Sequence, residues 1–310
     1  MNKQKEKILI IKFGALGDFI LCTGPFSAIR KYHPQAEITL LTTKPFEHLA
    51  KKAPWFDHIE IDLKPSALQL SNWLKMRKFI IGNKWSRIYD FQHNDRTDIY
   101  FRFLPKPKIE WSGITPGCSH PHLNPNRNNL HTIERQAEQL DIAGINQTPK
   151  TDIDWLKDDI SIFEIKKPFA LLVPGGAEHR KNKRWPKENY ASLAKYLNSV
   201  NITPVLIGGS PEENILREIE SQENYVINLC NLSSFGHIAS LARMAIISIG
   251  NDTGPMHIIA SAGCPSLVLF SEESNPDQTA PRGEKIAILK KNNLSDLDLV
   301  TVVSEVKNLL

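Results

Sequence analysis

Short apolar runs that alternate with helix-like segments are the feature that most limits what this chain can fold into. Strands are expected at 8–11, 38–42, 59–63 and 87–91 in the first half, and at 169–173, 204–207, 225–228, 244–249 and 266–270 in the second, and 8–11 is an uninterrupted apolar run. An uninterrupted apolar run is typical of a strand buried on both faces, and alternation with helices predicts a parallel sheet. Since 310 residues suffice for two ordinary domains, we expect an α/β protein with two doubly wound halves.

The stretch 148–167 mixes acidic and basic residues without a helical or strand period, which is typical of a linker. We therefore expect an N-terminal domain over 1–160 and a C-terminal domain over 161–310, with a last helix that could pack back on the N-terminal domain. Residues 105–130 hold several Pro and Asn residues and predict a long loop. Helices are expected at 46–52, 68–81, 131–140, 189–199, 212–221 and 235–242.

Composition narrows the classes of function. A hydrophobic content of 41% and a charged content of 23% indicate a folded globular protein. The net charge of +4 permits an acidic ligand or an anionic surface, but nucleic acid is not an expected partner. The four cysteines are scattered and form no C-x-x-C pair, so no zinc site is expected. No stretch of roughly twenty apolar residues exists, and we expect a cytoplasmic protein.

The most informative motif is Gly-Asn-Asp-Thr-Gly-Pro-Met-His over 250–257, which follows an apolar run and opens an apolar, helix-like segment. This order predicts a buried strand, a tight turn and a helix start, where unpaired N–H groups favour an anionic ligand. Asp252, Thr253 and His257 supply polar side chains, and Gly254 lets the backbone approach a ligand closely. An ordinary strand-to-helix connection capped by Asp or Thr is the alternative.

A second glycine-containing loop, Lys-Phe-Gly-Ala-Leu-Gly-Asp over 12–18, follows the first predicted strand. It matches neither the dinucleotide fingerprint nor the Walker loop, so it indicates nucleotide binding only weakly. Asp18 at the end of this loop is a candidate general base. Asp is also a favoured helix N-cap residue, and this alternative stays open.

A third loop, Pro-Gly-Gly-Ala over 174–177, leads into a basic run that ends in Trp185 and Pro186. Gly176 exposes backbone, and Lys183 is one of several cations suited to a diphosphate. A solvated charge run is the alternative, although Trp and Pro restrict the mobility of the chain.

Glu212 follows the Gly-Gly-Ser turn over 208–210 and is a candidate acceptor of ribose hydrogen bonds. An acidic residue that merely stabilises a first helical turn is the alternative. Asp152 to Asp154 has the Asp-x-Asp spelling but lies in the predicted linker, so no metal-diphosphate site is expected.

Together these segments resemble glycosyltransferase family 9, the heptosyltransferases of lipopolysaccharide core assembly. The resemblance rests on the opening Ile-Leu-Ile-Ile-Lys-Phe-Gly-Ala-Leu-Gly-Asp, on Pro-Gly-Gly-Ala followed by Lys-Arg-Trp-Pro, on Ile-Gly-Gly-Ser, and on Gly-Asn-Asp-Thr-Gly-Pro-Met-His. Weaker matches are Tyr-Asp-Phe-Gln at 89–92 and His-Thr-Ile-Glu-Arg at 131–135. The order of the motifs is that of the family, and they span nearly the whole chain.

The resemblance implies a GT-B fold, in which two Rossmann-like domains face each other across an active-site cleft. It implies metal-independent, inverting transfer of a heptose from ADP-heptose to an acceptor sugar of the lipopolysaccharide inner core. No cofactor is implied beyond the nucleotide-sugar donor. The site residues that it implies are Asp18 as the catalytic base, Lys183 on the diphosphate, Gly176, Asp252, Thr253, Gly254 and His257 around the sugar nucleotide, and, more loosely, Glu212 on the ribose.

Two segments depart from the family pattern: the loop 177–182 is unusually basic, and 93–96 reads His-Asn-Asp-Arg. Both could alter the acceptor or the sugar. A transferase that uses another nucleotide sugar and a non-catalytic sugar-nucleotide-binding protein stay open as alternatives, whereas the first loop disfavours a Rossmann dehydrogenase. The sequence pI near 8.7 and the cations Arg180, Lys181 and Arg184 predict an anionic lipid-linked acceptor and peripheral contact with a membrane surface.

Overall fold

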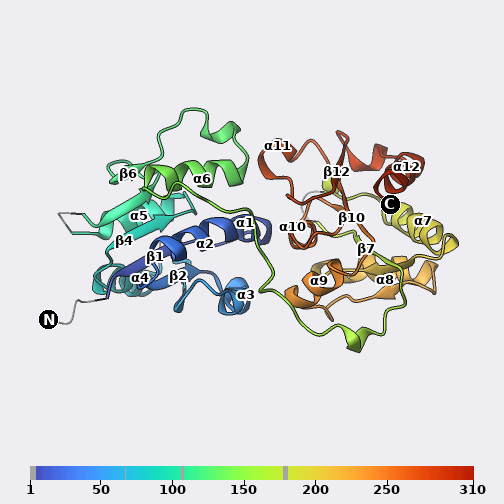
Figure 1. The fold of residues 1–310 in the computed structure, drawn as a ribbon, viewed down its shortest axis with the longest axis horizontal. Helices are drawn as coiled ribbons and strands as arrows, with labels where there is room; N and C mark the ends of the chain where they lie inside the picture. The colour runs from blue at the N-terminus through green and yellow to red at the C-terminus, as the bar shows by residue number, and fades with distance from the viewer. Residues whose placement is uncertain (1–4, 67, 106–107, 177–180) are drawn as a thin grey trace. The chain divides into compact units, whose positions relative to one another are not determined.

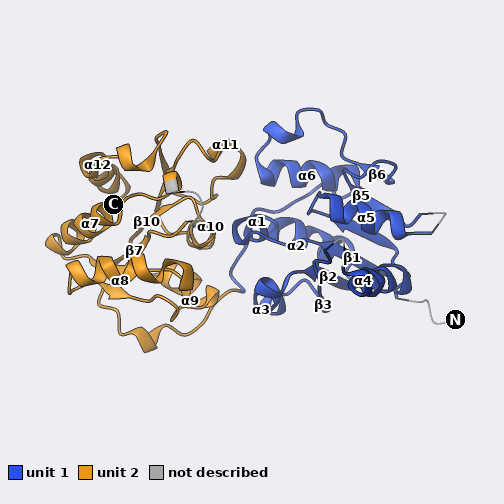
Figure 2. Cartoon of the chain, turned by 180° about the vertical axis from the view of Figure 1, so that it is seen from behind, with its two compact units in different colours: residues 1–155 blue, residues 156–310 orange. Residues whose placement is uncertain are grey.

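The computed structural model describes residues 5–66, 68–105, 108–176 and 181–310. The chain divides between Trp155 and Leu156 into two compact units, drawn in different colours in Figure 2. This division falls within the predicted linker, slightly before the predicted boundary at residue 160.

The first unit carries a six-stranded parallel sheet in the order β3-β2-β1-β4-β5-β6 with helices on both faces (Figure 1). Its strands are β1 (Lys7–Ile11), β2 (Glu37–Thr42), β3 (His58–Ile61), β4 (Arg87–Asp90), β5 (Glu110–Gly113) and β6 (His120–Pro121). Its helices are α1 (Leu16–Leu21), α2 (Thr23–Tyr32), α3 (Glu47–Lys52), α4 (Leu70–Gly82), α5 (Asp95–Phe103) and α6 (Thr132–Ile142), with short 3-10 turns η1 (Lys44–Phe46) and η2 (Arg127–Asn129).

The second unit repeats this plan, with the strand order β12-β11-β10-β7-β8-β9. Its strands are β7 (Phe169–Val173), β8 (Thr203–Leu206), β9 (Ile227–Asn228), β10 (Ile247–Asn251), β11 (Ser266–Phe270) and β12 (Ile286–Lys290). Its helices are α7 (Lys187–Ser199), α8 (Glu213–Gln222), α9 (Phe235–Ala242), α10 (Gly254–Ser261), α11 (Pro276–Thr279) and α12 (Leu299–Leu309), with 3-10 turns η3 (Ser161–Phe163), η4 (Lys181–Lys183), η5 (Ser210–Glu212) and η6 (Leu294–Asp296).

The predicted α/β fold class is confirmed, because every paired strand in both sheets runs parallel to its neighbours. In chain order within each unit, both sheets have the arrangement 3-2-1-4-5-6 of doubly wound dinucleotide-binding domains. The strand order reverses between β1 and β4 in the first unit and between β7 and β10 in the second. Ligands of such sheets bind at the carboxyl ends of the strands beside this reversal.

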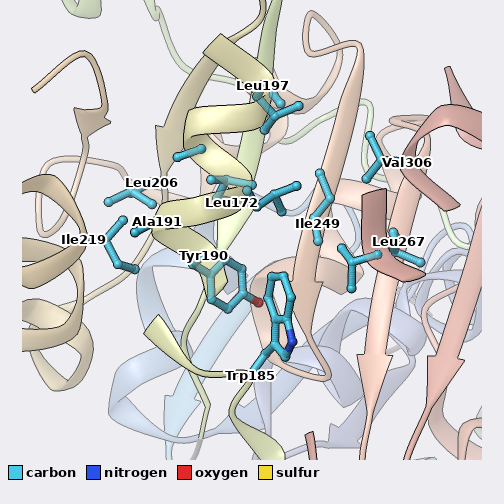
Figure 3. Close-up of a cluster of buried hydrophobic side chains, with 14 of the residues drawn as sticks. Leu172, Trp185, Tyr190, Ala191, Leu197, Leu206, Ile219, Ile249, Leu267 and Val306 are labelled. Carbon is cyan, nitrogen blue, oxygen red and sulfur yellow. The ribbon is translucent and has the colours of Figure 1, made fainter. Parts of the chain in front are cut away.

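The core of the second unit forms where α7, α8 and α12 pack on the sheet (Figure 3). Leu172, Ile249 and Leu267 are fully buried strand residues, as expected of a sheet covered on both faces. Val302 and Val306 of α12 belong to this same core, so the structure places the last helix on the second unit.

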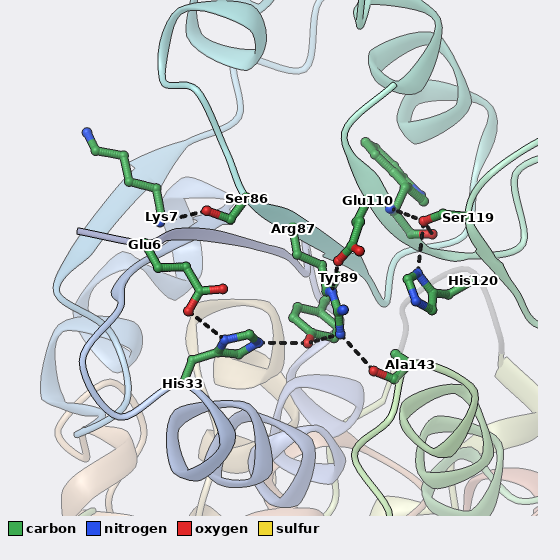
Figure 4. Close-up of polar contacts among 11 residues, drawn as sticks. Glu6, Lys7, His33, Ser86, Arg87, Tyr89, Glu110, Ser119, His120 and Ala143 are labelled. Atoms are coloured by element: carbon green, nitrogen blue, oxygen red, sulfur yellow. Dashed lines mark hydrogen bonds and ion pairs between the residues drawn. The ribbon is translucent and has the colours of Figure 1, made fainter. Parts of the chain in front are cut away.

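A polar network in the first unit lies at the amino-terminal ends of its central strands (Figure 4). The ring of His33, which ends α2, has Nδ1 3.0 Å from the Glu6 carboxylate and Nε2 2.9 Å from the Tyr89 hydroxyl. Arg87 donates to the Glu110 carboxylate at 2.6 Å and to the carbonyl of Ala143 at 2.7 Å. Burial raises the pKa of Tyr89 to about 12, so the phenol stays neutral. This network fixes α2 and the end of α6 to the sheet of the first unit, at the end of the strands opposite to the loop after β1.

The expected long loop over 105–130 is wrong in part, because β5 and β6 lie within it. These strands are only four and two residues long, and a strand that short leaves no readable period. Helix α5 also escaped prediction, although Asn94 and Thr97 form a capping box at its start.

Candidate active site

The loop after β1 holds Asp18 in the first turn of α1. The N-cap of this helix is Ala15, which makes no side-chain capping bond, so Asp18 does not have the N-cap role that stood as its alternative. Its carboxylate is 41% exposed and lies 3.8 Å from Nζ of Lys12, whose side chain is only 6% exposed. An exposed carboxylate can take a proton from a hydroxyl group that comes within hydrogen-bond reach.

Gly14 shapes this loop for a reason that applies to glycine alone. Its φ is +128°, a region that side chains of L residues avoid, and a Cβ atom there would lie 2.3 Å from the ring of Phe46. The backbone between β1 and α1 can therefore take this path only with glycine at position 14.

The segment after β4 places His93 among cations that come from other segments of the first unit. His93 has a φ of +53°, and its Nδ1 accepts a hydrogen bond from Arg127 at 3.1 Å. Burial holds the pKa of His93 well below its usual value, and the charges of Arg127, Lys12 and Arg135 lower it further. A neutral histidine therefore lies among three cations that can meet an anionic group.

Arg96, in the segment that departs from the family pattern, is engaged within the first unit. Its guanidinium lies 4.9 Å from the centre of the Phe13 ring and donates to Asp62 at 2.8 Å. Tyr100 donates to the same Asp62 carboxylate at 2.7 Å. These contacts connect α5 to the loop after β1. Arg96 therefore helps to hold that loop in place.

In the second unit, Asn251 connects the loops after β7 and β10. Its side-chain nitrogen donates to the carbonyls of Pro174 and Gly175 at 2.8 and 3.0 Å. Its side-chain oxygen accepts from the backbone of Trp185 at 3.2 Å and from the Tyr190 hydroxyl at 3.0 Å. Asn251 is fully buried and uses both ends of its amide, so its loss would leave several buried polar groups unsatisfied.

Lys183 and Asp252 form a largely buried ion pair at the reversal of the strand order. The Nζ–Oδ2 distance is 2.7 Å, and the side chains are 11% and 10% exposed. Lys183 ends η4, and Asp252 follows β10 directly. Lys183, predicted to bind the diphosphate, thus contacts Asp252 of the Gly-Asn-Asp-Thr-Gly motif. Asp252 lies two residues before the start of α10.

Helix α10 begins directly after this pair. Thr253 is its N-cap residue but makes no side-chain capping bond, which does not fit the alternative of an ordinary Thr cap. Gly254 is the first helical residue, Pro255 removes one N–H from the first turn, and His257 is buried in that turn. The positive end of the helix dipole therefore lies beside Lys183 and Asp252.

Glu212 has the structural role that stood as its alternative, because its Oε2 accepts from the backbone of Gly209 at 3.0 Å. It also lines a cavity of about 170 Å³ together with Gly175, Gly208, Phe235 and Thr253. A Cβ atom on Gly175 would lie 2.9 Å from Cγ of Glu212, so glycine there lets the two loops approach closely. Glu212 thus faces the same cavity as the β7 and β10 loops.

The described part of the basic loop is bonded within the second unit. Arg184 donates to the carbonyl of Gly176 at 2.5 and 3.2 Å, and Lys183 is paired with Asp252. Residues 177–180, Arg180 among them, and the side chain of Lys181 lie outside the described part of the structure. Arg184 is therefore held in place in the loop after β7.

The structure thus divides the predicted site residues between the two units. Asp18 stands alone in the first, while the second group holds Gly176, Lys183, Glu212, Asp252, Thr253, Gly254 and His257. Sequence reasoning missed Asn251, although it lies inside the motif, because its hydrogen-bond partners are distant in sequence. It also missed the cations Arg127 and Arg135, which only the fold brings to His93. Among the described residues, no cluster of three or more His, Cys, Asp or Glu side chains could hold a metal ion.

Comparisons with known proteins identify relatives of this chain. The profile of glycosyltransferase family 9 (heptosyltransferase) matches residues 124–306. The chain is 30% identical to lipooligosaccharide heptosyltransferase 2 of Haemophilus influenzae, over 91% of this chain and 88% of the relative. Its fold matches a family 9 glycosyl transferase from Veillonella parvula, with a TM-score of 0.84 at 19% identity, covering 100% and 98% of the two chains. It also matches ADP-heptose lipopolysaccharide heptosyltransferase II of Escherichia coli, with a TM-score of 0.80 at 19% identity and 98% of each chain covered.

Proposed function

Because this chain belongs to glycosyltransferase family 9, the heptosyltransferases, we propose that it transfers a heptose from ADP-heptose to a lipopolysaccharide inner-core acceptor, with inversion at the sugar. The GT-B fold and the glycosyltransferase class follow from the family and its solved relatives. The observation that carries the finer proposal is the Lys183–Asp252 pair at the start of α10, where an anionic donor would meet positive charge.

In the proposed reaction, an acceptor hydroxyl attacks the anomeric carbon of the heptose from the face opposite ADP. The new C–O bond forms as the bond to the diphosphate breaks, and ADP leaves with the electron pair. A hydroxyl attacks poorly while it keeps its proton, so a base must take the proton as the bond forms. Asp18 is our candidate for this base, because its exposed carboxylate lies beside Lys12 and caps no helix.

The leaving diphosphate gains negative charge as the bond breaks. In our proposal, Lys183 and the amino end of α10 stabilise that charge, with Gly176, Thr253 and Gly254 at the backbone of the donor loops and His257 in the first helical turn. The ribose would lie at the cavity lined by Glu212.

The acceptor in this proposal is anionic and lipid-linked. Lys12, Arg127 and Arg135 concentrate positive charge around His93 in the unit that carries Asp18, which suits phosphate or carboxylate groups on a saccharide. Such an acceptor would hold the enzyme at the cytoplasmic face of a membrane. Within the described residues, no helix has the length and apolar character needed to cross a bilayer.

The test of this function begins with thermal shift in ADP, UDP, GDP and CDP, followed by transfer assays with ADP-heptose. We expect ADP to stabilise the protein most and transfer to require ADP-heptose, because ligand binding raises the unfolding temperature by mass action. Stabilisation by a different nucleotide would support a transferase with another donor. ADP binding without transfer to any saccharide acceptor would instead support a non-catalytic sugar-nucleotide-binding protein.

Transfer is also expected to survive chelation with EDTA. Lys183 and the start of α10 supply positive charge that a divalent cation supplies in other transferases, so the diphosphate should not need one. The measurement is the initial rate before and after EDTA, followed by added Mg²⁺ or Mn²⁺. A rate that collapses in EDTA and returns with either cation would contradict this expectation.

A further inference from the structure

Four exposed leucines lie close together in sequence in the first unit, two before α4 and two in its first turns. Leu63, Leu68, Leu70 and Leu74 are 40%, 93%, 70% and 64% exposed. Single exposed apolar residues are ordinary, but a cluster over twelve consecutive positions is typical of an interaction surface. We call these four residues the leucine patch.

The helical spacing of α4 places two leucines of the patch on the same face as two basic residues. Leu70, Leu74, Arg77 and Lys78 stand at positions i, i+4, i+7 and i+8 of α4, so they share one face. All four are exposed, whereas Met76 and Ile80 of the same helix are buried in the core of the unit. The exposed face of α4 therefore takes no part in holding the unit together.

The charge around the patch has one sign. Between positions 63 and 84 the sequence holds five basic residues, Lys64, Lys75, Arg77, Lys78 and Lys84, and no acidic residue. Within the described part of the chain, no ion pair joins Lys75, Arg77 or Lys78 to a carboxylate. Their charge is therefore not neutralised within the unit.

We propose that the leucine patch and the cations of α4 dock this protein on an anionic phospholipid surface. Basic side chains are attracted to acidic headgroups, while leucines enter the boundary between headgroups and acyl chains. A second copy of this chain fits the surface less well, because the same cations would face each other and repel. The proposal deepens the proposed function, since it rests on an acceptor that is lipid-linked, and it moves the membrane contact from the basic loop after β7 to the first unit.

The test is sedimentation of the full chain with vesicles of phosphatidylcholine alone or of phosphatidylcholine mixed with phosphatidylglycerol. We expect binding to the mixed vesicles to exceed binding to the neutral ones by about tenfold or more at low salt, and to fall as salt is added. The double variant Leu70→Ser/Leu74→Ser and the variant Lys78→Glu should each weaken binding to the mixed vesicles by about tenfold.

Two matched controls separate this surface from a general effect of composition. Leu123→Ser removes a leucine that is 75% exposed elsewhere in the first unit, and Lys195→Glu reverses an exposed helical charge on α7. Both should bind mixed vesicles as the wild type does, and all variants should keep the wild-type unfolding temperature. Wild-type failure to bind mixed vesicles, equal loss in the controls, or a change of oligomeric state in place of vesicle binding would overturn the proposal.

Vesicle binding needs neither donor nor acceptor, so this result is independent of sugar transfer. The patch variants should transfer heptose to a short, water-soluble acceptor at the wild-type rate. If no transfer is found with any protein while vesicle binding still depends on the patch, the proposed function fails and the docking surface stands. If transfer is found and the patch variants bind vesicles like the wild type, the docking surface fails alone.

Discussion

Asp18→Asn is expected to lower the transfer rate by about 10²- to 10⁴-fold, the range that a positioned general base contributes. Asparagine keeps the size and the hydrogen-bonding oxygen of the side chain but cannot accept the acceptor proton. ADP binding should stay near the wild-type value, because the proposed donor residues lie in the other unit. The measurements are kcat with ADP-heptose and acceptor, and the thermal shift produced by ADP.

The fold should tolerate this substitution. Asp18 is 41% exposed and lies in the first turn of α1, where a carboxylate stabilises a helix by only about 0.3–1 kcal/mol through the dipole. Glu188→Gln is the matched control, since Glu188 is an exposed carboxylate in the first turn of α7. Turnover by Asp18→Asn that equals turnover by the control would remove Asp18 as the base and require another proton acceptor.

The fold was predictable because its strands are short, apolar and buried on both faces. Runs such as 8–11 and 169–173 can be recognised from sequence without knowledge of their partners. The edge strand β12 was not predicted, although 286–289 is an apolar run in the sequence. Its residues are half-buried or exposed, and its place in the sheet depends on pairing with β11. The last helix α12 likewise depends on Asp298 as a cap and on a core that only the folded sheet provides.

The candidate site was predictable where its residues lie in one loop, and not where they converge from several. Asp252, Thr253 and Gly254 follow one strand directly in the sequence. A prediction of a strand, a turn and a helix therefore places them in the same loop. The pairing of Lys183 with Asp252 joins residues far apart in the chain and depends on β7 lying next to β10. The same is true of Asn251, whose amide connects loops that no local pattern relates.

Two alternatives were decided by geometry that sequence does not carry. Asp and Thr are both favoured N-cap residues, yet Asp18 lies within its helix and the Thr253 side chain makes no capping bond. Glu212 shows the opposite outcome, because it does stabilise its own turn through Gly209 while it also lines the cavity. Residue type alone left a structural alternative open at all three positions: an N-cap at Asp18 and Thr253, and stabilisation of a first helical turn at Glu212.

Lys183→Met is expected to lower kcat/KM for transfer by about 10²- to 10³-fold, the usual effect of removing one strong contact to developing charge. Methionine keeps the buried stem of the side chain and removes the ammonium. The effect on ADP binding should be smaller than the effect on transfer, since the charge on the diphosphate grows as the bond breaks. Lys187→Met is the control, because Lys187 pairs with Glu218 on the surface of the same unit and should be replaceable without loss of transfer.

Lys183 could act on the diphosphate directly or only by neutralising Asp252, and a second substitution separates the two roles. In Lys183→Met, the Asp252 carboxylate, 10% exposed, loses its partner and would repel the donor. Asp252→Asn in the same protein removes that repulsion. If Lys183 contacts the diphosphate, the double variant should remain at least about tenfold below the single variant Asp252→Asn, because the cation that meets the leaving group is still missing. Transfer by the double variant equal to that of Asp252→Asn would show that Lys183 acts only through its carboxylate partner.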